Sequence, residues 1–323
     1  MIEAVNLTKR YGKKTAVDNI SFTVEPGTVT GFLGPNGAGK STTMRMIMGL
    51  DKPTSGKVTI NGRPYRQLSA PLCEVGALLD AKGLHGSRSA RSHLRQLAAS
   101  NGIPAKRVDE VLDITGLTSV AKKRVKGFSL GMGQRLGIAA ALLGDPGVLL
   151  FDEPVNGLDP EGVKWVRETC RRLAGGGRTV FISSHLMSEM AQTADHLLVI
   201  GRGRILTAGP VNDVIASATT DRVRVASPQA TQLAELMASR NLAAQPVAPN
   251  VLETTATTAA TIGELAAQGG IVLHELTTIH ASLEEAYMTL TSDSVEYRTD
   301  PASQAQMQQA QVRQAVPQGS ARG

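Results

Sequence analysis

The chain has 323 residues, a net charge of +6 and a hydrophobic share of 41%, with few aromatic residues. Its length exceeds that of a typical single domain, so one large domain and a smaller one are expected. No apolar run approaches the roughly eighteen residues of a membrane span, and the first residues lack the basic and apolar segments of a secretion signal. Two widely separated cysteines, Cys73 and Cys170, exclude a disulfide framework and favour a reducing cytosol.

From the N-terminus, short β-rich runs alternate with turn signals. Residues 2–7, 16–24 and 57–60 are rich in β-branched or alternating apolar residues, which predicts three strands. A further apolar run over 29–33 leads into a glycine-rich segment, and a helix-like run over 41–50 follows it. The glycine-rich segment therefore lies between a predicted strand and a predicted helix.

The glycine-rich segment fits the pattern G-x-x-x-x-G-K-[ST]. Its glycines allow backbone N–H groups to turn inward, so that a phosphate lies at the positive end of the following helix. Lys40 is expected to reach the β- and γ-phosphates, and the Ser41 hydroxyl to ligate Mg²⁺. The sequence thus predicts a nucleoside triphosphate site formed by Gly34, Pro35, Asn36, Gly37, Ala38, Gly39, Lys40, Ser41 and Thr42.

Between residues 63 and 126, twelve basic side chains stand against five acidic ones. Such an excess is typical of a surface that meets nucleic acid or an anionic membrane, and equally of a solvated helical face. Aromatic residues, which stack on bases, do not interleave with these charges, so nucleic acid is not expected as a partner.

The middle of the chain alternates helical and β-rich patterns. Apolar residues at helix-like spacing run from 84 to 116, and shorter segments of both kinds follow. Strands are predicted over 148–151, 179–182 and 197–200, and helices over 133–143 and 161–173. Strand–helix alternation of this kind favours a largely parallel α/β sheet.

The apolar run over 148–151 ends in two carboxylates, Asp152 and Glu153. Two adjacent acids at the end of a buried strand are costly unless a cation or a substrate offsets their charge. Asp152 is expected to hold Mg²⁺, as in the second half of a phosphate-loop site, and Glu153 to orient and polarise the attacking water.

A second unit begins near residue 218. Its pattern predicts a small α+β module, with strands over 222–225, 251–254 and 271–276 and helices over 229–240, 261–268 and 283–290. Two histidines in it, His274 and His280, lack a third ligand, so no metal site is predicted there. From residue 293 onward the chain is rich in Gln, Ala and Ser, which predicts a disordered tail.

Three further motifs follow the phosphate loop. The segment 128–135 reads FSLGMGQR, the segment 156–160 reads NGLDP, and the segment 183–185 reads SSH. Together with the phosphate loop, they resemble the signature, D-loop and switch histidine of the nucleotide-binding subunit of ATP-binding cassette (ABC) transporters. The resemblance runs from about residue 2 to residue 217.

The resemblance implies an ATP site shared by two copies of the chain. In this family each ATP lies between the phosphate loop of one subunit and the signature of the other. Ser129 and Gly131 would present a hydroxyl and a backbone N–H to the γ-phosphate in trans, and His185 would contact that phosphate in cis. Asp159 would connect the two sites across the interface, and the Tyr11 ring would stack on adenine.

Two positions depart from the family pattern. Asp80 stands where the family usually has a glutamine that senses Mg²⁺ and couples to the membrane partner, and a carboxylate can itself ligate Mg²⁺. The signature has Leu130 and Met132 in place of a glycine and a glutamine, while Ser129 and Gly131 are kept. Slower or differently coupled hydrolysis is therefore expected, not its loss.

The expected fold is α/β: a phosphate-loop nucleotide-binding domain of the ABC type, with an antiparallel β subdomain and a helical subdomain. This domain is expected over residues 1–217, with the helical subdomain at about 84–145. A small α+β accessory domain is expected over 218–292, and the disordered Gln/Ala-rich tail over 293–323. ATP and Mg²⁺ are the expected cofactors.

The function implied by the resemblance is ATP binding and hydrolysis by a dimer that powers a separate membrane permease. Asp80, the NGLDP segment and the C-terminal module resemble the bacterial drug- and antibiotic-export branch, that of bacitracin- and daunorubicin-resistance proteins. Such a subunit would lie at the cytoplasmic face of the cell membrane. The alternative is a non-transport ABC-type ATPase that acts on the ribosome or on DNA. The single phosphate loop and the lack of sustained heptads disfavour it.

Overall fold

The computed structural model describes residues 1–80, 83 and 85–291. The predicted tail over 293–323 lies outside these residues, as do residue 84 and residue 292, at the ends of two predicted units. None of the helices in the described part of the chain is long and apolar enough to cross a bilayer.

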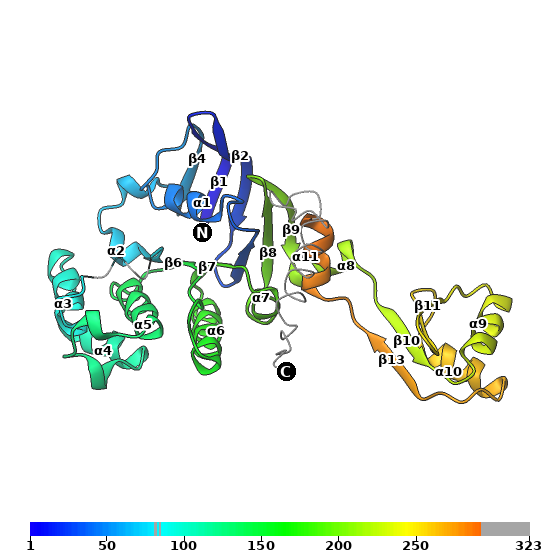
Figure 1. The fold of residues 1–323 in the computed structure, drawn as a ribbon. Coiled ribbons are helices and arrows are strands. Elements are labelled where there is room, and N and C mark those ends of the chain that lie inside the picture. Colours follow the sequence, from blue (N-terminus) through cyan, green and yellow to red (C-terminus); the bar gives the residue numbers. More distant parts are fainter. Residues whose placement is uncertain (81–82, 84, 292–323) are drawn as a thin grey trace, which may run out of the picture.

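The N-terminal strands form an antiparallel sheet in the order β2-β1-β4 (Figure 1). It consists of β1 (Ile2–Tyr11), β2 (Lys14–Val24) and β4 (Ser55–Ile60). The three predicted strands are confirmed, but β1 and β2 extend further toward their shared turn. The predicted strands are shorter because the residues near the turn are mostly charged and exposed, a pattern that is typical of a loop.

The main sheet has six strands in the order β5-β6-β7-β3-β8-β9. They are β5 (Val75–Leu78), β6 (Val148–Asp152), β7 (Thr179–Ser184), β3 (Val29–Leu33), β8 (His196–Gly201) and β9 (Arg204–Pro210). All neighbouring pairs are parallel except β8 with β9. The predicted largely parallel α/β sheet is confirmed, and its central strands are buried on both faces, as their continuous apolar runs require.

Aromatic side chains join the two sheets. Phe22 of β2 lies 5.9 Å from Phe181 of β7 and 6.2 Å from Phe32 of β3, measured between ring centroids. This cluster lies on the same face of the main sheet as α1 (Lys40–Ile47), whose Met44 and Ile47 belong to the same core. The antiparallel sheet is thereby held next to the segment that follows β3.

The opposite face of the main sheet is covered by helices. They include α5 (Leu130–Ala141), α6 (Pro160–Gly175), α7 (Met187–Thr193) and α8 (Val211–Ala218). A helical group forms where α5 packs on β5 and contacts α3 (Ala90–Ser100) and α4 (Lys106–Ile114). Short pieces complete the chain: α2 (Pro71–Glu74), η1 (Tyr65–Gln67), η3 (Thr118–Val120) and η4 (Val125–Gly127).

The C-terminal module has the element order β-α-β-β-α-β and a separate core. Its sheet, in the order β11-β12-β10-β13, is antiparallel throughout, which is the ferredoxin-like arrangement. The elements are β10 (Arg222–Ala226), α9 (Ala230–Ser239), β11 (Gln245–Ala248), β12 (Val251–Thr254), α10 (Ala259–Gln268) and β13 (Glu275–Ile279). The sequence did not predict β11, because all its residues are exposed and one is a proline. The last strand lies later than the predicted 271–276.

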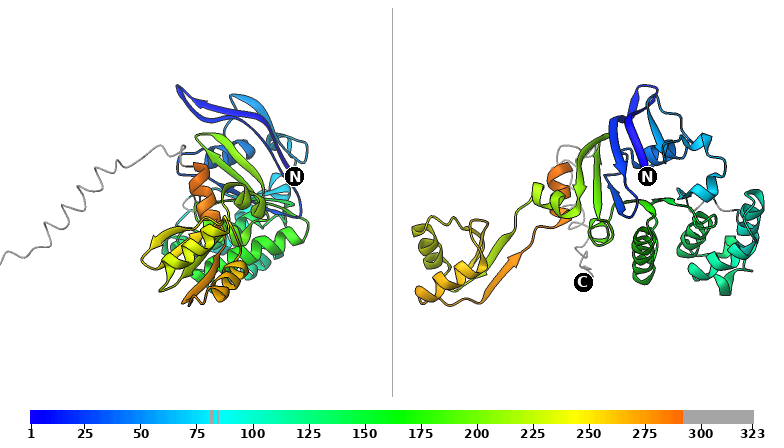
Figure 2. Two further views of the ribbon diagram at one scale, coloured as in Figure 1. Left: turned by 90° about the vertical axis from the view of Figure 1, so that its right-hand side faces the viewer. Right: turned by 180° about the vertical axis from the view of Figure 1, so that it is seen from behind.

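The helix predicted over 283–290 lies elsewhere than expected. It forms α11 (Leu283–Thr291), but it packs against α7 and α8, and its Leu283 and Tyr287 belong to the core of the N-terminal unit. The module is therefore an insertion between α8 and α11, connected by the adjacent strands β10 and β13 (Figures 1 and 2). An ion pair of 2.7 Å between Arg222 and Glu285 joins the base of this connection to α11.

The contact between β5 and α5 leaves no room for a side chain at Gly76. A Cβ atom there would lie 2.0 Å from the Ala141 carbonyl oxygen. We predict that Gly76→Ala lowers the free energy of unfolding by about 1–3 kcal/mol, because the helix must shift to accept the methyl group. Urea or thermal denaturation measures the loss. Gly147→Ala, where nothing lies within 4 Å of the added Cβ, is the matched control, and equal losses in both variants would contradict the prediction.

Candidate nucleotide-binding site

The predicted site residues gather at one edge of the main sheet. In the order β5-β6-β7-β3, four neighbouring parallel strands end there. Asp80 follows β5, Asp152 and Glu153 lie at the end of β6, and His185 follows β7. The phosphate loop, 34–42, follows β3. The carboxyl edge of parallel strands is where α/β folds bind their ligands.

The phosphate loop adopts the backbone that its glycines allow. Gly37 and Gly39 have φ values of 82° and 112°, in the left-handed region. A Cβ atom on Gly39 would lie 2.6 Å from the Ala16 carbonyl oxygen, and one on Gly34 would lie 2.5 Å from that of Ile200. Helix α1 begins at Lys40 without a side-chain cap, so its first N–H groups are available to an anion.

Lys40 is buried in this loop, with 6% of its surface exposed. Its Nζ donates to the Gly34 carbonyl oxygen at 2.6 Å and lies 3.9 Å from Glu153 Oε1. Burial lowers the pKa of Lys40, while the nearby Glu153 and Asp152 carboxylates act in the opposite direction. The ammonium group is thus held by loop carbonyls that a phosphate oxygen can replace.

Ser183 of β7 orients both acidic residues. Its hydroxyl donates to Asp152 Oδ1 at 2.5 Å and accepts from the Glu153 backbone N–H at 3.0 Å. Glu153 itself has a φ of 50°, which is rare for a residue other than glycine, and this hydrogen bond holds it. The sequence indicates Ser183 only as part of the SSH segment, and no local pattern predicts that it orients the two acidic residues.

The Glu153 carboxylate connects two of the predicted motifs. Its Oε1 faces Lys40 of the phosphate loop, and its Oε2 lies 2.8 Å from His185 Nδ1. His185 is thus held in place by the residue predicted to polarise the attacking water. Nδ1 is the ring nitrogen bonded to Glu153, so Nε2 is the nitrogen left to face a substrate.

The donor set fits Mg²⁺ bound together with a nucleotide. Among the described residues, no group of three His, Cys, Asp or Glu side chains is placed to hold a metal ion by itself. Ser41 on the first turn of α1 and Asp152 offer a hydroxyl and one carboxylate, and Asp80 lies at the same edge. Mg²⁺ commonly takes one or two such protein ligands and completes its shell with phosphate oxygens and water.

The signature segment packs against the D-loop segment. Ser129 caps α5, with its hydroxyl accepting from the Met132 N–H at 3.2 Å, and Asp159 caps α6 in the same way at 2.9 Å from the Gly162 N–H. A Cβ atom on Gly157 would lie 2.1 Å from the Leu130 side chain. The leucine that departs from the family pattern therefore lies over the D-loop glycine.

Gln134, on α5, links the signature helix to the acidic strand end. Its amide nitrogen lies 3.4 Å from the carbonyl oxygens of Glu153 and Asn156. By contrast, no hydrogen bond or ion pair within the described residues joins the 129–132 segment to the phosphate loop. One copy of the chain thus brings Lys40, Asp152, Glu153 and His185 together, and Asp80 lies at the same edge of the sheet.

Tyr11 lies beside the start of α1, at the turn between β1 and β2. It is 47% exposed, and its hydroxyl donates to Asp51 Oδ2 at 2.9 Å. Asp51 also accepts from Arg45 Nε at 2.8 Å, which fixes the position of the carboxylate. The Lys9 ammonium lies 4.8 Å from the centre of the ring. An exposed, anchored ring in this position suits stacking against a base.

Comparisons with known proteins point to one family. A family described as ABC transporter matches residues 17–156. The chain is 45% identical over 213 residues to the bacitracin transport ATP-binding protein BcrA of Bacillus licheniformis, covering 65% of this chain and 70% of that protein. The chain belongs to the ABC transporter family. The matched range contains the phosphate loop, the signature and the acidic strand end.

A second relative extends the similarity of this ABC ATPase into its C-terminal module. The daunorubicin resistance ATP-binding protein DrrA3 of Streptomyces coeruleorubidus is 32% identical over 301 residues, covering 88% of this chain and 94% of that protein. A domain of unknown function, DUF8746, matches residues 221–284, which include β10 to β13. A solved structure, the dimeric structure of MJ0796, a bacterial ABC transporter cassette, shares the fold with a TM-score of 0.60 at 24% identity, covering 65% of this chain and 98% of that one.

We predict that Lys40→Met removes nucleotide binding without lowering the stability of the nucleotide-free ABC ATPase. Methionine is similar in length, and it removes a charge that is costly to hold at 6% exposure. Thermal denaturation with and without Mg-ATP tests both parts. The melting temperature should rise with nucleotide in the wild type and stay constant in the variant. A variant that still responds to ATP would contradict the role given to Lys40.

Proposed function

We propose that this ABC ATPase powers a separate membrane permease that exports a drug, an antibiotic or another hydrophobic compound. The proposal rests on the contacts between Lys40, Glu153 and His185: Glu153 Oε1 faces Lys40 of the phosphate loop, and Glu153 Oε2 lies 2.8 Å from His185 Nδ1. The proposed general base, Glu153, therefore contacts both the phosphate loop and the histidine. The direction of transport is supported by similarity to proteins named for bacitracin transport and daunorubicin resistance.

In the proposed reaction, Glu153 polarises the attacking water and His185 Nε2 contacts the γ-phosphate. Lys40 moves from the Gly34 carbonyl to the phosphate oxygens, where its charge is used to offset theirs. Mg²⁺, when held by Ser41 and Asp152 with or without Asp80, neutralises charge on the phosphates. Ser183 keeps Asp152 and Glu153 in position throughout.

The proposed active form is a dimer of two copies with two ATP molecules between them. In support, no hydrogen bond or ion pair among the described residues joins the signature segment to the phosphate loop of its own chain, and its predicted contact with phosphate is assigned to another copy. Ser129 and Gly131 stand at the start of α5, where a backbone N–H and a hydroxyl can meet an anion. Asp159, at the start of α6, lies beside this segment.

The permease is proposed to meet the helical group formed by α3, α4 and α5. The connection from α4 to α5 carries four of the basic side chains between residues 63 and 126, which suits contact with a permease and with anionic lipid. They are Lys122, Lys123, Arg124 and Lys126. The ABC ATPase would then act at the cytoplasmic face of the membrane. Co-purification tests this against action on the ribosome or DNA: a partner with several membrane spans supports transport, and bound nucleic acid contradicts it.

Glu153→Gln is expected to trap an ATP-bound dimer with very low turnover. The amide keeps the shape of the side chain but cannot accept the water's proton, so hydrolysis should fall by at least about a hundredfold. Steady-state phosphate release and gel filtration with Mg-ATP measure the two effects. Glu168→Gln, an exposed change on α6, is the control. An unchanged rate of hydrolysis in Glu153→Gln would show that Glu153 does not polarise the attacking water.

Asp80→Gln is expected to retain ATP binding while changing the stimulation of hydrolysis by the permease. The substitution restores the residue usual in the family and removes one negative charge near the Mg²⁺ site. Nucleotide binding and the ATPase rate, each with and without the permease in vesicles, give the comparison. Loss of ATP binding would instead make Asp80 a structural residue.

A further inference from the structure

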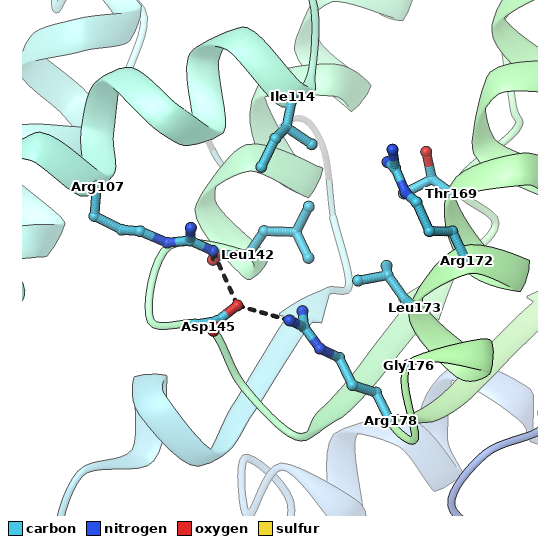
Figure 3. A pocket seen from close by; sticks show the side chains of 9 residues that line it. All are labelled: Arg107, Ile114, Leu142, Asp145, Thr169, Arg172, Leu173, Gly176 and Arg178. Atoms are coloured by element: carbon cyan, nitrogen blue, oxygen red, sulfur yellow. Dashed lines mark hydrogen bonds and ion pairs between the residues drawn. The ribbon is translucent and has the colours of Figure 1, made fainter.

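A cavity lies beside the amino ends of β6 and β7, opposite to the strand ends that lie next to the phosphate loop. Figure 3 shows the side chains that line it. Its volume is about 300 Å³, at the lower end of the range for small-molecule pockets. Asp145 and Arg178, which line it, stand shortly before the amino ends of β6 and β7. None of the predicted nucleotide-site residues is among its lining residues.

The cavity lies between the helical group and the main sheet. Arg107 and Ile114 reach it from α4, Leu142 from the end of α5, and Leu173 from α6. Asp145 ties the two sides together: its Oδ1 accepts from Arg107 at 3.1 Å and from Arg178 at 2.8 Å. A ligand in this cavity would therefore contact both the helical group and the elements on the main sheet, which the Asp145 carboxylate links.

Three guanidinium groups face the cavity, and Asp145 is the single carboxylate among its lining residues. Arg107 is already well satisfied, since it also pairs with Glu110 at 2.8 Å and donates to the Leu142 carbonyl oxygen at 3.1 Å. Arg172 differs, because this exposed residue makes no hydrogen bond or ion pair with the residues that the structure describes. The local field is positive, and the Arg172 guanidinium is open to water or to a ligand.

Thr169 provides a second unused donor. It stands one helical turn before Arg172 on α6, and both line the cavity. Thr169 is 3% exposed, yet its hydroxyl has no side-chain hydrogen bond in the described part of the chain. A hydroxyl and a guanidinium on one helix face make a matched pair of donors for a carboxylate.

The rest of the wall is apolar. Ile114, Leu142 and Leu173 face one another across the cavity, and Ile114 is 37% exposed there. A purely inorganic anion would leave these side chains in contact with water. An anion with a short apolar body would cover them and still reach Arg172.

We propose that this cavity binds a small organic carboxylate with an apolar body. The carboxylate is received by Arg172 and Thr169, and the body packs on Ile114, Leu142 and Leu173. Because the ligand touches α4 and α6, it reinforces the Asp145 contacts that join the helical group to the main sheet. The cavity is thus a regulatory binding site of the ABC ATPase, separate from the site for ATP.

Phenylacetate is a suitable probe, with phenylacetamide as its neutral analogue and inorganic phosphate as a charge without an apolar body. The full chain is first saturated with Mg-ADP, so that the phosphate loop is occupied. Calorimetry or ligand-observed NMR should then detect saturable binding of phenylacetate in the low-millimolar range or tighter. Phenylacetamide and phosphate should each bind at least about tenfold more weakly.

Arg172→Gln should weaken phenylacetate binding by about tenfold, whereas Arg171→Gln, an exposed neighbour outside the cavity, should have no effect. Thr169→Val tests the second donor and should weaken binding by a smaller factor. Equal affinity in the two arginine variants, equal binding of the amide, or no saturable binding to the wild type would each overturn the proposal. ATP hydrolysis in the absence of phenylacetate should be the same in both arginine variants.

Discussion

The buried ammonium group of Lys40 is the constraint around which the nucleotide site is organised. A charge with 6% exposure must be met by hydrogen-bond acceptors or by opposite charge. The Gly34 carbonyl supplies the first and the Glu153 carboxylate the second. The loop therefore turns its carbonyl toward the ammonium group, and the Glu153 side chain faces it. The buried charge and the positive φ of Glu153 lower the stability of the nucleotide-free protein, and they leave a site preorganised for phosphate.

The fold and much of the site follow from the sequence because their signals are local. A glycine pattern after an apolar run specifies the phosphate loop by itself, and an apolar run ending in Asp152 and Glu153 specifies the strand end. The contributions of Ser183 and Gln134 were not predicted. Each depends on which elements become neighbours: Ser183 acts because β7 pairs with β6, and Gln134 because α5 packs beside the loop after β6.

The C-terminal module also shows that a local sequence pattern does not specify which elements become neighbours. The pattern over 283–290 correctly indicates an amphipathic helix, but it does not say which core the apolar face joins. Leu283 and Tyr287 pack with α7 and α8, so the chain leaves the N-terminal unit at α8 and returns to it at α11. Burial there raises the pKa of Tyr287 to about 12. An insertion with its own core, tied by Arg222 and Glu285, is able to vary without disturbing the nucleotide edge.

The two edges of the main sheet are connected through the same strands and through α5. Asp145 and Arg178 precede β6 and β7, while Asp152 and Ser183 lie at the far ends of those strands. The helix α5 carries Ser129 and Gln134 near the nucleotide edge and ends at the carbonyls that accept from Arg107. A ligand that packs on Ile114 and Leu142 while Arg172 and Thr169 of α6 hold its carboxylate would therefore fix the far end of the signature helix relative to α6. In the proposed dimer, Ser129 contacts an ATP held by another copy, so the position of that helix would decide whether the composite site closes. Regulation at the amino edge would act through this geometry, without any contact with nucleotide.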